Sequence, residues 1–170
     1  MKYNKVLSKI SIDNVRTIGD DFLFFNQNLR KITLLFVTKI GNNFLKYNKV
    51  LESIYFPRLK EIEDNFLYEN RNLGSISISC LEKIGNSFMY YNRNVSMVFF
   101  PNVKVIGDAF FNFNTKISSI SFPYVEKIGN DFLRCNMKIE QENIYMPNVV
   151  YIGNGFLFWK QVHGSKSKSR

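Results

Sequence analysis

The amino-acid sequence predicts a β-rich repeat solenoid of about seven coils, with short helical or irregular turns, over residues 1–159. The first observation is near-verbatim repetition, since EKIGNDFLRCN at 126–136 restates EKIGNSFMYYN at 82–92. The second is a 22-residue period that brings most apolar positions into register, and the third is a hydrophobic content of 45%, ample for a continuous core. An active site needs its motif once, whereas a stacked unit is restated in every coil.

Two apolar columns define the frame. Isoleucine recurs as Ile18, Ile40, Ile62, Ile84, Ile106 and Ile128, and Ile152 follows after a 24-residue step. Phenylalanine stands four residues later, as Phe22, Phe44, Phe66, Phe88, Phe110, Phe132 and Phe156. Because columns at the repeat period stack on one another in a solenoid, both columns are predicted to face the core.

The first element of each unit is a strand. LESIYF at 51–56 shows the period-two alternation of a half-buried strand, and the equivalent segment ends at proline in four units. The second element, V-x-x-I-G as in VEKIG at 125–129, is a shorter extended segment that turns at glycine. We expect these glycines to adopt positive φ, which leaves Glu63, at the same position, as the departure.

An aspartate or asparagine follows every turn: Asp20, Asn42, Asp64, Asn86, Asp108, Asn130 and Asn154. Such a side chain can accept hydrogen bonds from backbone N–H groups two or three residues on, which predicts the N-cap of a one-turn helix. The alternative is a row of calcium ligands. We disfavour it because only three members are charged and no second acidic column supplies further oxygen ligands.

A second asparagine column lies eight residues after the isoleucine. We interpret it as a structural ladder in which each amide bonds the backbone of its own and the neighbouring coil, rather than as a row of active-site residues. The ladder comprises Asn26, Asn48, Asn70, Asn92, Asn114 and Asn136, preceded by Asn4 in a partial first unit.

The combined pattern L-x-x-I-x-F-P-x-V-x-x-I-G-x-x-F-L-x-x-N resembles the BspA-type leucine-rich repeat over residues 4–159. Units of that family usually read L-x-x-I-x-I-P-x-x-V-x-x-I-G-x-x-A-F-x-x-C. This chain has one residue fewer between Pro and Val, Leu or Met after the Phe, and Asn in place of Cys. The resemblance implies a leucine-rich-repeat-like solenoid with one sheet on a concave face. It also implies a surface protein that binds other proteins and has no shared catalytic residues.

Composition bounds the remaining chemistry. The opening MKYNKVLSKISI lacks the apolar segment of a secretory signal, and no run is long enough to span a membrane, so we expect no membrane insertion. The sequence leaves two cellular locations open. The absence of a signal segment favours the cytoplasm, and the family resemblance implies the cell surface. Cys80 and Cys135 lie in different columns and are predicted to be free thiols. No cofactor or metal site is expected.

Strand alternation predicts the candidate binding residues of the concave sheet. One exposed column runs Ser11, Thr33, Tyr55, Ser77, Phe99, Ser121, Tyr145, so that small and aromatic side chains alternate from Thr33 onward. The column two residues earlier runs Lys9, Lys31, Ser53, Ser75, Met97, Ser119, Asn143. The rings either cover the sheet or bind a partner. The candidates taken as binding residues are Thr33, Tyr55, Ser77, Met97, Phe99, Ser121 and Tyr145.

A second candidate surface is the basic ridge, defined as Lys46, Lys49, Arg71, Arg93, Lys116, Arg134 and Lys138. Aromatic residues are interleaved with it: Phe25, Tyr47, Tyr68, Tyr90, Tyr91 and Phe113. Cations among aromatics can grip phosphates and bases, but they also commonly cover the core at a soluble turn edge. Four of the nine net positive charges come from the Ser/Lys-rich segment 160–170, which we expect to be a disordered tail.

Three functions follow from these patterns. The leading prediction is a noncatalytic module that recognises a protein partner through the concave sheet. The second is a piece of a longer solenoid that self-associates end to end, because the first and last units look like interior units without polar caps. The third is a binder of nucleic acid or another polyanion. An enzyme is not expected, since no nucleophile, base and orienting group converge.

Overall fold

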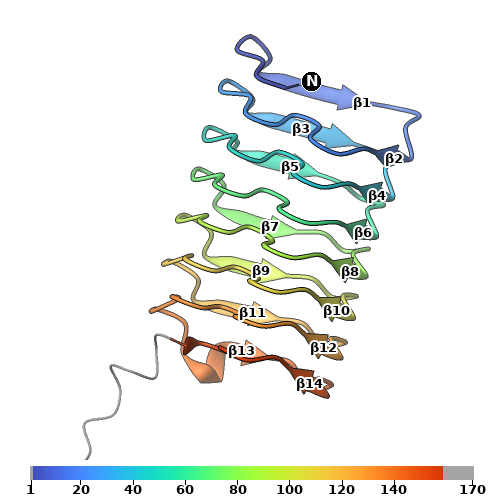
Figure 1. Cartoon of the computed structure of the whole chain (residues 1–170). Helices are drawn as coiled ribbons and strands as arrows, with labels where there is room; N and C mark the ends of the chain where they lie inside the picture. The colour runs from blue at the N-terminus through green and yellow to red at the C-terminus, as the bar shows by residue number, and fades with distance from the viewer. Residues whose placement is uncertain (1, 159–170) are drawn as a thin grey trace, which may run out of the picture.

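The computed structural model describes residues 2–158, which wind into a stack of coils (Figure 1). Each coil contributes a longer strand, a shorter strand and a return segment, and strands of successive coils pair in parallel. The predicted β-rich repeat solenoid is therefore confirmed. Trp159 and the tail predicted at 160–170 lie outside the described residues.

The longer strands carry the L-x-x-I-x-F motif and form what we call the long-strand face. Successive strands pair in register, so that Ile32 lies opposite Ile10 on one side and Ile54 on the other. Hydrogen-bonded pairing runs in two parts, β1-β3-β5 and β7-β9-β11-β13. The strands are β1 (Lys9–Ile12), β3 (Lys31–Leu34), β5 (Ser53–Tyr55), β7 (Ser75–Ser77), β9 (Met97–Phe99), β11 (Ser119–Ser121) and β13 (Ile144–Tyr145).

The shorter strands form one continuous seven-stranded ladder at another side of the coil, as Figure 1 shows along one edge of the stack. They are β2 (Thr17–Ile18), β4 (Lys39–Ile40), β6 (Glu61–Ile62), β8 (Lys83–Ile84), β10 (Val105–Ile106), β12 (Lys127–Ile128) and β14 (Tyr151–Ile152). The 24-residue step lies in the last coil, where a 3-10 helix, η1 (Gln141–Asn143), precedes β13.

The phenylalanine column forms the spine of the core. Neighbouring rings from Phe22 to Phe156 lie nearly parallel, with centroids 5.2 to 6.1 Å apart. Rings such as Phe100 meet the spine edge-on, and offset-stacked and edge-on pairs are both favourable for aromatic rings. The sequence period is therefore expressed as a continuous ring stack that ties each coil to the next.

The return segment joins each shorter strand to the next longer strand and is not the one-turn helix predicted from the sequence. In residues 42–48 alternate positions have positive φ: Asn43 (56°), Leu45 (55°) and Tyr47 (63°). Asn43 and Tyr47 donate backbone N–H to the following coil, whereas Leu45 donates to Phe22 O of the preceding coil. Left-handed conformations of such residues cost about 1 to 2 kcal/mol each, and the hydrogen bonds between coils offset this cost.

The Asp/Asn column also corrects the N-cap prediction. From Asp20 to Asn130, each side-chain oxygen accepts the backbone N–H of the equivalent residue one coil later. Examples are Asn86 N to Asp64 Oδ1 and Asp108 N to Asn86 Oδ1, both 2.7 Å. Asp and Asn alternate from Asp20 to Asn130. Adjacent coils therefore place a neutral amide, not a second carboxylate, beside each charge, which avoids like-charge repulsion between neighbours.

The glycine column is explained by close approach between coils, because none of its members has positive φ. A Cβ built at Gly107 would lie 2.6 Å from Asn86 Oδ1 and 2.7 Å from the Gly85 carbonyl carbon. Glu63 occupies this column without positive φ, and the bond beside it, from Asp64 N to Asn42 Oδ1, is 3.1 Å long. The prediction that these glycines adopt positive φ was therefore wrong.

The second asparagine column bonds both coils that it touches. The Nδ2 atom of Asn70 donates to Leu45 O of the preceding coil at 2.7 Å and to Tyr68 O of its own coil at 3.3 Å. The same pair of contacts recurs for Asn48, Asn92, Asn114 and Asn136. The buried amides thus satisfy backbone carbonyls at the corner where the return segment ends.

Replacing Asn70 by alanine is expected to lower the free energy of unfolding by about 1 to 3 kcal/mol, because two carbonyls lose their donor. Urea denaturation measures the loss. Asn72→Ala is the matched control, since Asn72 is exposed and its amide makes one long contact, 3.5 Å to Val50 O. An unchanged urea midpoint for Asn70→Ala would remove the ladder from the account of stability.

Candidate functional site

Strand alternation sorts the side chains of the long-strand face. The isoleucine and valine residues at strand centres are buried, as Ile76 and Val98 are, or partly buried, as Ile54 is, while their neighbours point outward. The exposed fractions are 58% for Tyr55, 49% for Phe99 and 57% for Tyr145. These three rings therefore stand outside the core, unlike the phenylalanine spine.

The register of the strands sets small residues between the rings. Ser77 pairs with Phe99, Phe99 with Ser121, and Ser121 with Tyr145; Thr33 likewise pairs with Tyr55. Ser77 is exposed, whereas Thr33 and Ser121 are half-buried. Met97, two residues before Phe99 on β9, is 60% exposed. The structure thus brings the seven predicted residues to one face, but spreads them over six coils rather than into one compact site.

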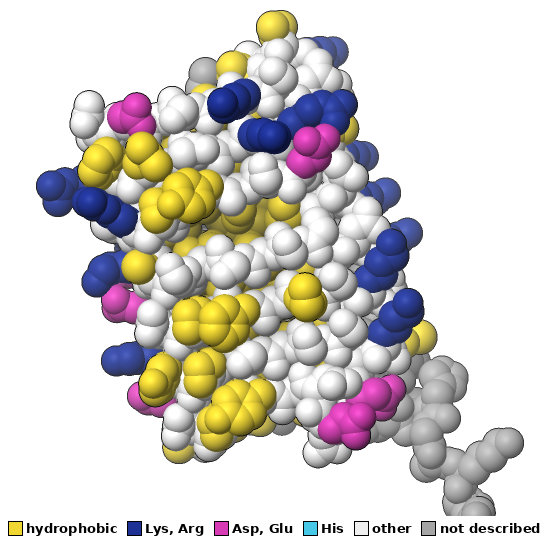
Figure 2. All heavy atoms as spheres, turned by 180° about the vertical axis from the view of Figure 1, so that it is seen from behind, with side chains coloured by type: hydrophobic (Ala, Val, Ile, Leu, Met, Phe, Trp, Pro, Cys, Tyr) yellow, Lys and Arg dark blue, Asp and Glu magenta, His cyan; other side chains and the backbone are white. Residues whose placement is uncertain are grey.

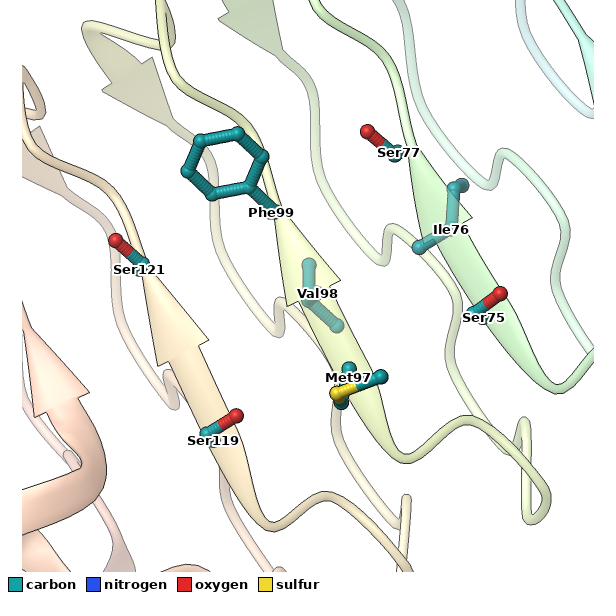
Figure 3. A pocket seen from close by; sticks show the side chains of 8 residues that line it. All are labelled: Ser75, Ile76, Ser77, Met97, Val98, Phe99, Ser119 and Ser121. Atoms are coloured by element: carbon teal, nitrogen blue, oxygen red, sulfur yellow. The ribbon is translucent and has the colours of Figure 1, made fainter.

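Hollows lie beside two of the three exposed rings, which we call the aromatic rungs. One, of about 390 Å³, is lined by side chains of β7, β9 and β11, with Met97 and Phe99 at its centre and serines on either side (Figure 3). A second, of about 330 Å³, lies between Tyr55 and Ser77, where the pairing between β5 and β7 is interrupted. Figure 2 shows large hydrophobic side chains spaced down this face, with hydrophobic surface exposed in the hollows.

Four residues at this face were not among the candidates predicted from the sequence. Ser75 and Ser119 line the larger hollow, and their position opposite Met97 in the register was the signal that could have identified them. Beyond the longer strand, the Arg58 guanidinium lies 4.8 Å from the centre of the Phe36 ring. In four units a proline marks the end of the longer strand, but Leu35 stands at that position before Phe36. The sequence therefore contains no turn signal to indicate that Phe36 would be exposed beside the face.

Charge is unevenly distributed over the face. The hollow on β7, β9 and β11 is lined by uncharged residues, whereas Lys9 and Lys31 lie opposite each other on β1 and β3. Within the described residues neither ammonium has an ion-pair or hydrogen-bond partner. Two like charges directly opposite on neighbouring strands repel, so the N-terminal end of the face holds an uncompensated positive pair.

The shorter strands show the opposite arrangement. Lys39 Nζ lies 2.8 Å from Glu63 Oε1 and 3.2 Å from Glu61 Oε2. The hydrogen bond to Glu63, followed by that to Glu61, raises the pKa of Lys39, and the Lys39 bond lowers the pKa of Glu63. Lys60 pairs with Glu82 in the same way. Ion pairs between neighbouring coils therefore neutralise part of the charge along this sheet.

The basic ridge is not one continuous line. Lys46 and Arg134 belong to return segments, whereas Lys49, Arg71 and Arg93 share a column just past the asparagine ladder, and Lys116 and Lys138 occupy the next column. Lys46 Nζ lies 4.3 Å from the centre of the Tyr68 ring, and Tyr68 stacks on Tyr90 at 4.9 Å. Partial burial raises the pKa of both tyrosines.

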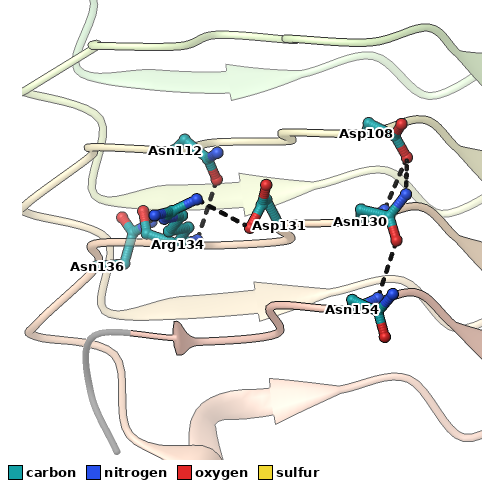
Figure 4. A network of polar contacts seen from close by, with 7 residues as sticks. All are labelled: Asp108, Asn112, Asn130, Asp131, Arg134, Asn136 and Asn154. Carbon is teal, nitrogen blue, oxygen red and sulfur yellow. Dashed lines mark hydrogen bonds and ion pairs between the residues drawn. The ribbon is translucent and has the colours of Figure 1, made fainter. Parts of the chain in front are cut away.

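Most ridge cations are engaged within the solenoid. Arg71 Nη2 lies 3.0 Å from Glu69 Oε2, and Lys116 Nζ lies 2.8 Å from Asn94 Oδ1. Arg134 pairs with Asp131 at 3.3 Å within the polar network of Figure 4. Among the described residues, Lys49 and Lys138 make no ion pair or hydrogen bond through their side chains. The ridge is therefore largely committed to contacts with its own coils.

Other chemistry is limited in the described part of the chain. Cys80 and Cys135 are free thiols, and burial raises the pKa of the Cys135 thiol. No group of three or more His, Cys, Asp or Glu side chains lies close enough to hold a metal ion within residues 2–158. Over the same residues, no helix is long and apolar enough to cross a membrane.

The strand edges of the end coils are where end-to-end association would occur. Among the described residues β1 pairs only with β3 and β13 only with β11, which leaves one side of each without a strand partner. Exposed apolar side chains lie at both ends, including Val6 at 85% and Val150 at 79%. Self-association through these ends stays a prediction.

Comparison with known proteins agrees with this architecture. The family described as "BspA type Leucine rich repeat region" matches in six copies, over residues 2–112 and 38–161. Neither curated proteins nor solved structures give a significant match. Leucine-rich repeat proteins often mediate protein interactions and are generally noncatalytic. Since the matched repeats span most of its length, the chain belongs to the BspA-type leucine-rich repeat family.

Proposed function

We propose that the chain is a noncatalytic recognition module that binds a protein partner through the long-strand face. The observation that carries the proposal is the row of exposed rings, Tyr55, Phe99 and Tyr145, with hollows beside Tyr55 and Phe99. These rings make no contribution to the phenylalanine spine, so core packing does not account for them. Exposed aromatic side chains beside desolvated pockets are the usual anchors of protein interfaces.

The residue types that could support catalysis are used elsewhere in the fold. The aspartates of the turn column accept backbone N–H groups of the next coil, and the buried asparagines donate to backbone carbonyls. The lysines and glutamates of the shorter strands pair with one another. These structural roles support the noncatalytic part of the proposal.

Phe99→Ala is expected to weaken a protein partner about 30-fold or more, because an aromatic anchor at the centre of an interface contributes about 2 kcal/mol or more. The fold should survive, since the Phe99 ring is 49% exposed. The measurement is fluorescence anisotropy with a partner isolated on the immobilised chain from an extract of the source organism. Circular dichroism melts of the variant provide the folding control.

The paired change Arg71→Ala and Arg93→Ala is the matched control. It should change the affinity for a protein partner by no more than about fivefold, because exposed rim charges contribute up to about 1 kcal/mol together. A polyanion bound to the basic ridge would give the reverse, with a steep salt dependence. If the arginine pair abolished binding and Phe99→Ala left it intact, the ridge would replace the long-strand face as the binding surface.

A further inference from the structure

We propose that the long-strand face takes a proline-rich segment in the polyproline II conformation, running along the solenoid axis, with acidic residues at the end near β1. This inference rests on the proposed function and names the chemistry of the partner. Three independent features carry it: the spacing of the aromatic rungs, the hydrogen-bonding groups between them, and the distribution of charge over the face.

Spacing selects the conformation of the segment. Tyr55, Phe99 and Tyr145 stand on every second coil. Phe99 and Tyr145 are separated by two hydrogen-bonded strand steps of about 4.8 Å each, which place these two rungs about 9.6 Å apart. Three residues of polyproline II advance about 9.3 Å, so one turn fits one interval between rungs. Two turns of α-helix advance about 10.8 Å, and alternate residues of an extended strand are about 6.7 Å apart.

The other regular conformations fit this interval less well. Over the paired strands from β9 to β13, three polyproline II residues differ from the interval of about 9.6 Å by about 0.3 Å, and two helical turns differ from it by about 1.2 Å. Polyproline II is therefore the conformation that best keeps equivalent side chains beside successive rungs. The pyrrolidine ring is also compact enough to enter between two aromatic rungs, which is how aromatic-lined grooves recognise proline.

The hollows supply donors that such a segment needs. Ser75, Ser77, Ser119 and Ser121 border the larger hollow, and none of their hydroxyls makes a hydrogen bond in the part of the chain that the structure describes. Figure 3 shows these four hydroxyls on the outer side of the sheet, flanking Met97 and Phe99. Polyproline II has no internal hydrogen bonds, so its carbonyls remain free to accept from them.

Charge gives the segment a direction. The two ammonium groups of Lys9 and Lys31 repel each other in register, although the same fold pairs Lys39 and Lys60 with carboxylates. No carboxylate of the described residues neutralises the Lys9 and Lys31 pair. An acidic residue at the adjoining end of the bound segment would remove this repulsion, whereas the hollows near β9 call for uncharged residues.

The test uses the full chain and a fluorescent peptide of four Pro-Pro-Ala repeats preceded or followed by two glutamates. Fluorescence anisotropy compares it with three peptides of the same length. In the first, glycine replaces every proline; in the second, lysine replaces each glutamate; the third is an Ala/Leu helix-forming peptide with the same glutamates. We expect one orientation of the proline peptide to bind at least tenfold more tightly than any of the three.

Matched variants locate the bound peptide. Phe99→Ala should weaken binding at least tenfold, and Phe99→Tyr should retain it. Ser77→Phe, which fills a hollow without touching the core, should weaken it as well. Lys9→Gln with Lys31→Gln should remove the preference for glutamate over lysine and leave the preference for proline over glycine unchanged.

Equal affinity for the proline and glycine peptides would overturn the inference. Binding of the proline peptide that is unchanged by Phe99→Ala and by Ser77→Phe would also overturn it. If the isolated partner or the helical peptide bound in a Phe99-dependent way while the proline peptide did not, this inference would fail and the proposed function would stand. If Phe99→Ala also left the affinity for the isolated partner unchanged, both this inference and the proposed function would fail.

Discussion

Phe88→Ala is expected to lower the free energy of unfolding by about 3 to 5 kcal/mol, the range for deleting a fully buried phenylalanine. The Phe88 ring is inaccessible to solvent. It stacks at 5.2 Å on both Phe66 and Phe110 and receives the edge of Phe100 at 5.6 Å. The change removes contacts to both neighbouring coils, so urea denaturation should show a lower midpoint.

Phe22→Ala is the matched control for Phe88→Ala. Phe22 occupies the same column in the first full coil, is only half-buried, and stacks on Phe44 alone at 6.1 Å. We expect a loss of about 1 to 2 kcal/mol, because less apolar surface is exposed by the deletion. Equal losses for the two variants would show that stacking between coils does not dominate the stability of the spine.

Gly129→Ala is expected to destabilise the fold by about 1 to 3 kcal/mol through overpacking. A Cβ at this position would lie 2.3 Å from Asp108 Oδ1 and 2.7 Å from both the Asp108 nitrogen and the Gly107 carbonyl carbon. Because two of these atoms are backbone, rotation of a side chain cannot relieve the contact. Thermal denaturation measures the effect as a lower melting temperature.

Gly19→Ala is the matched control, because Gly19 belongs to the same column but has no close contact with a preceding coil. No atom lies within 4 Å of a Cβ built at Gly19, and its φ is not positive. Alanine there restricts the unfolded chain and should be neutral or stabilising by up to about 1 kcal/mol. If both glycine variants behaved alike, close approach between coils would not be the reason for the glycine column.

The fold was predictable because its determinants are periodic in sequence. Each column, such as that of Ile62 and Ile84, specifies one position in the coil and its partner in the next. The return segment was not predictable, since positive φ is normally indicated by glycine or asparagine, and here Leu45 and Tyr47 adopt it. Hydrogen bonds between coils select that conformation, and no local motif reports them.

The outward orientation of the candidate binding residues was predictable from the sequence, but the hollows beside them were not. Alternation along a strand is enough to point Tyr55 and Phe99 away from the core. The interruption of pairing between β5 and β7, and the hollow beside it, depend on how two backbones lie relative to each other. The ridge residues Arg71 and Lys116 were recognisable as cations, but their intramolecular partners were not.

The location of binding is tested most directly by two natural reporters. Met97 lies on the long-strand face and is 60% exposed, whereas Met137 lies beside the basic ridge, one residue past Asn136, and is 62% exposed. Met89 is fully buried and serves as the internal control. In NMR spectra of the chain labelled with ¹³C at methionine methyl groups, addition of the isolated partner should shift or broaden the Met97 resonance and leave those of Met137 and Met89 unchanged. A response at Met137 with none at Met97 would contradict binding through the long-strand face.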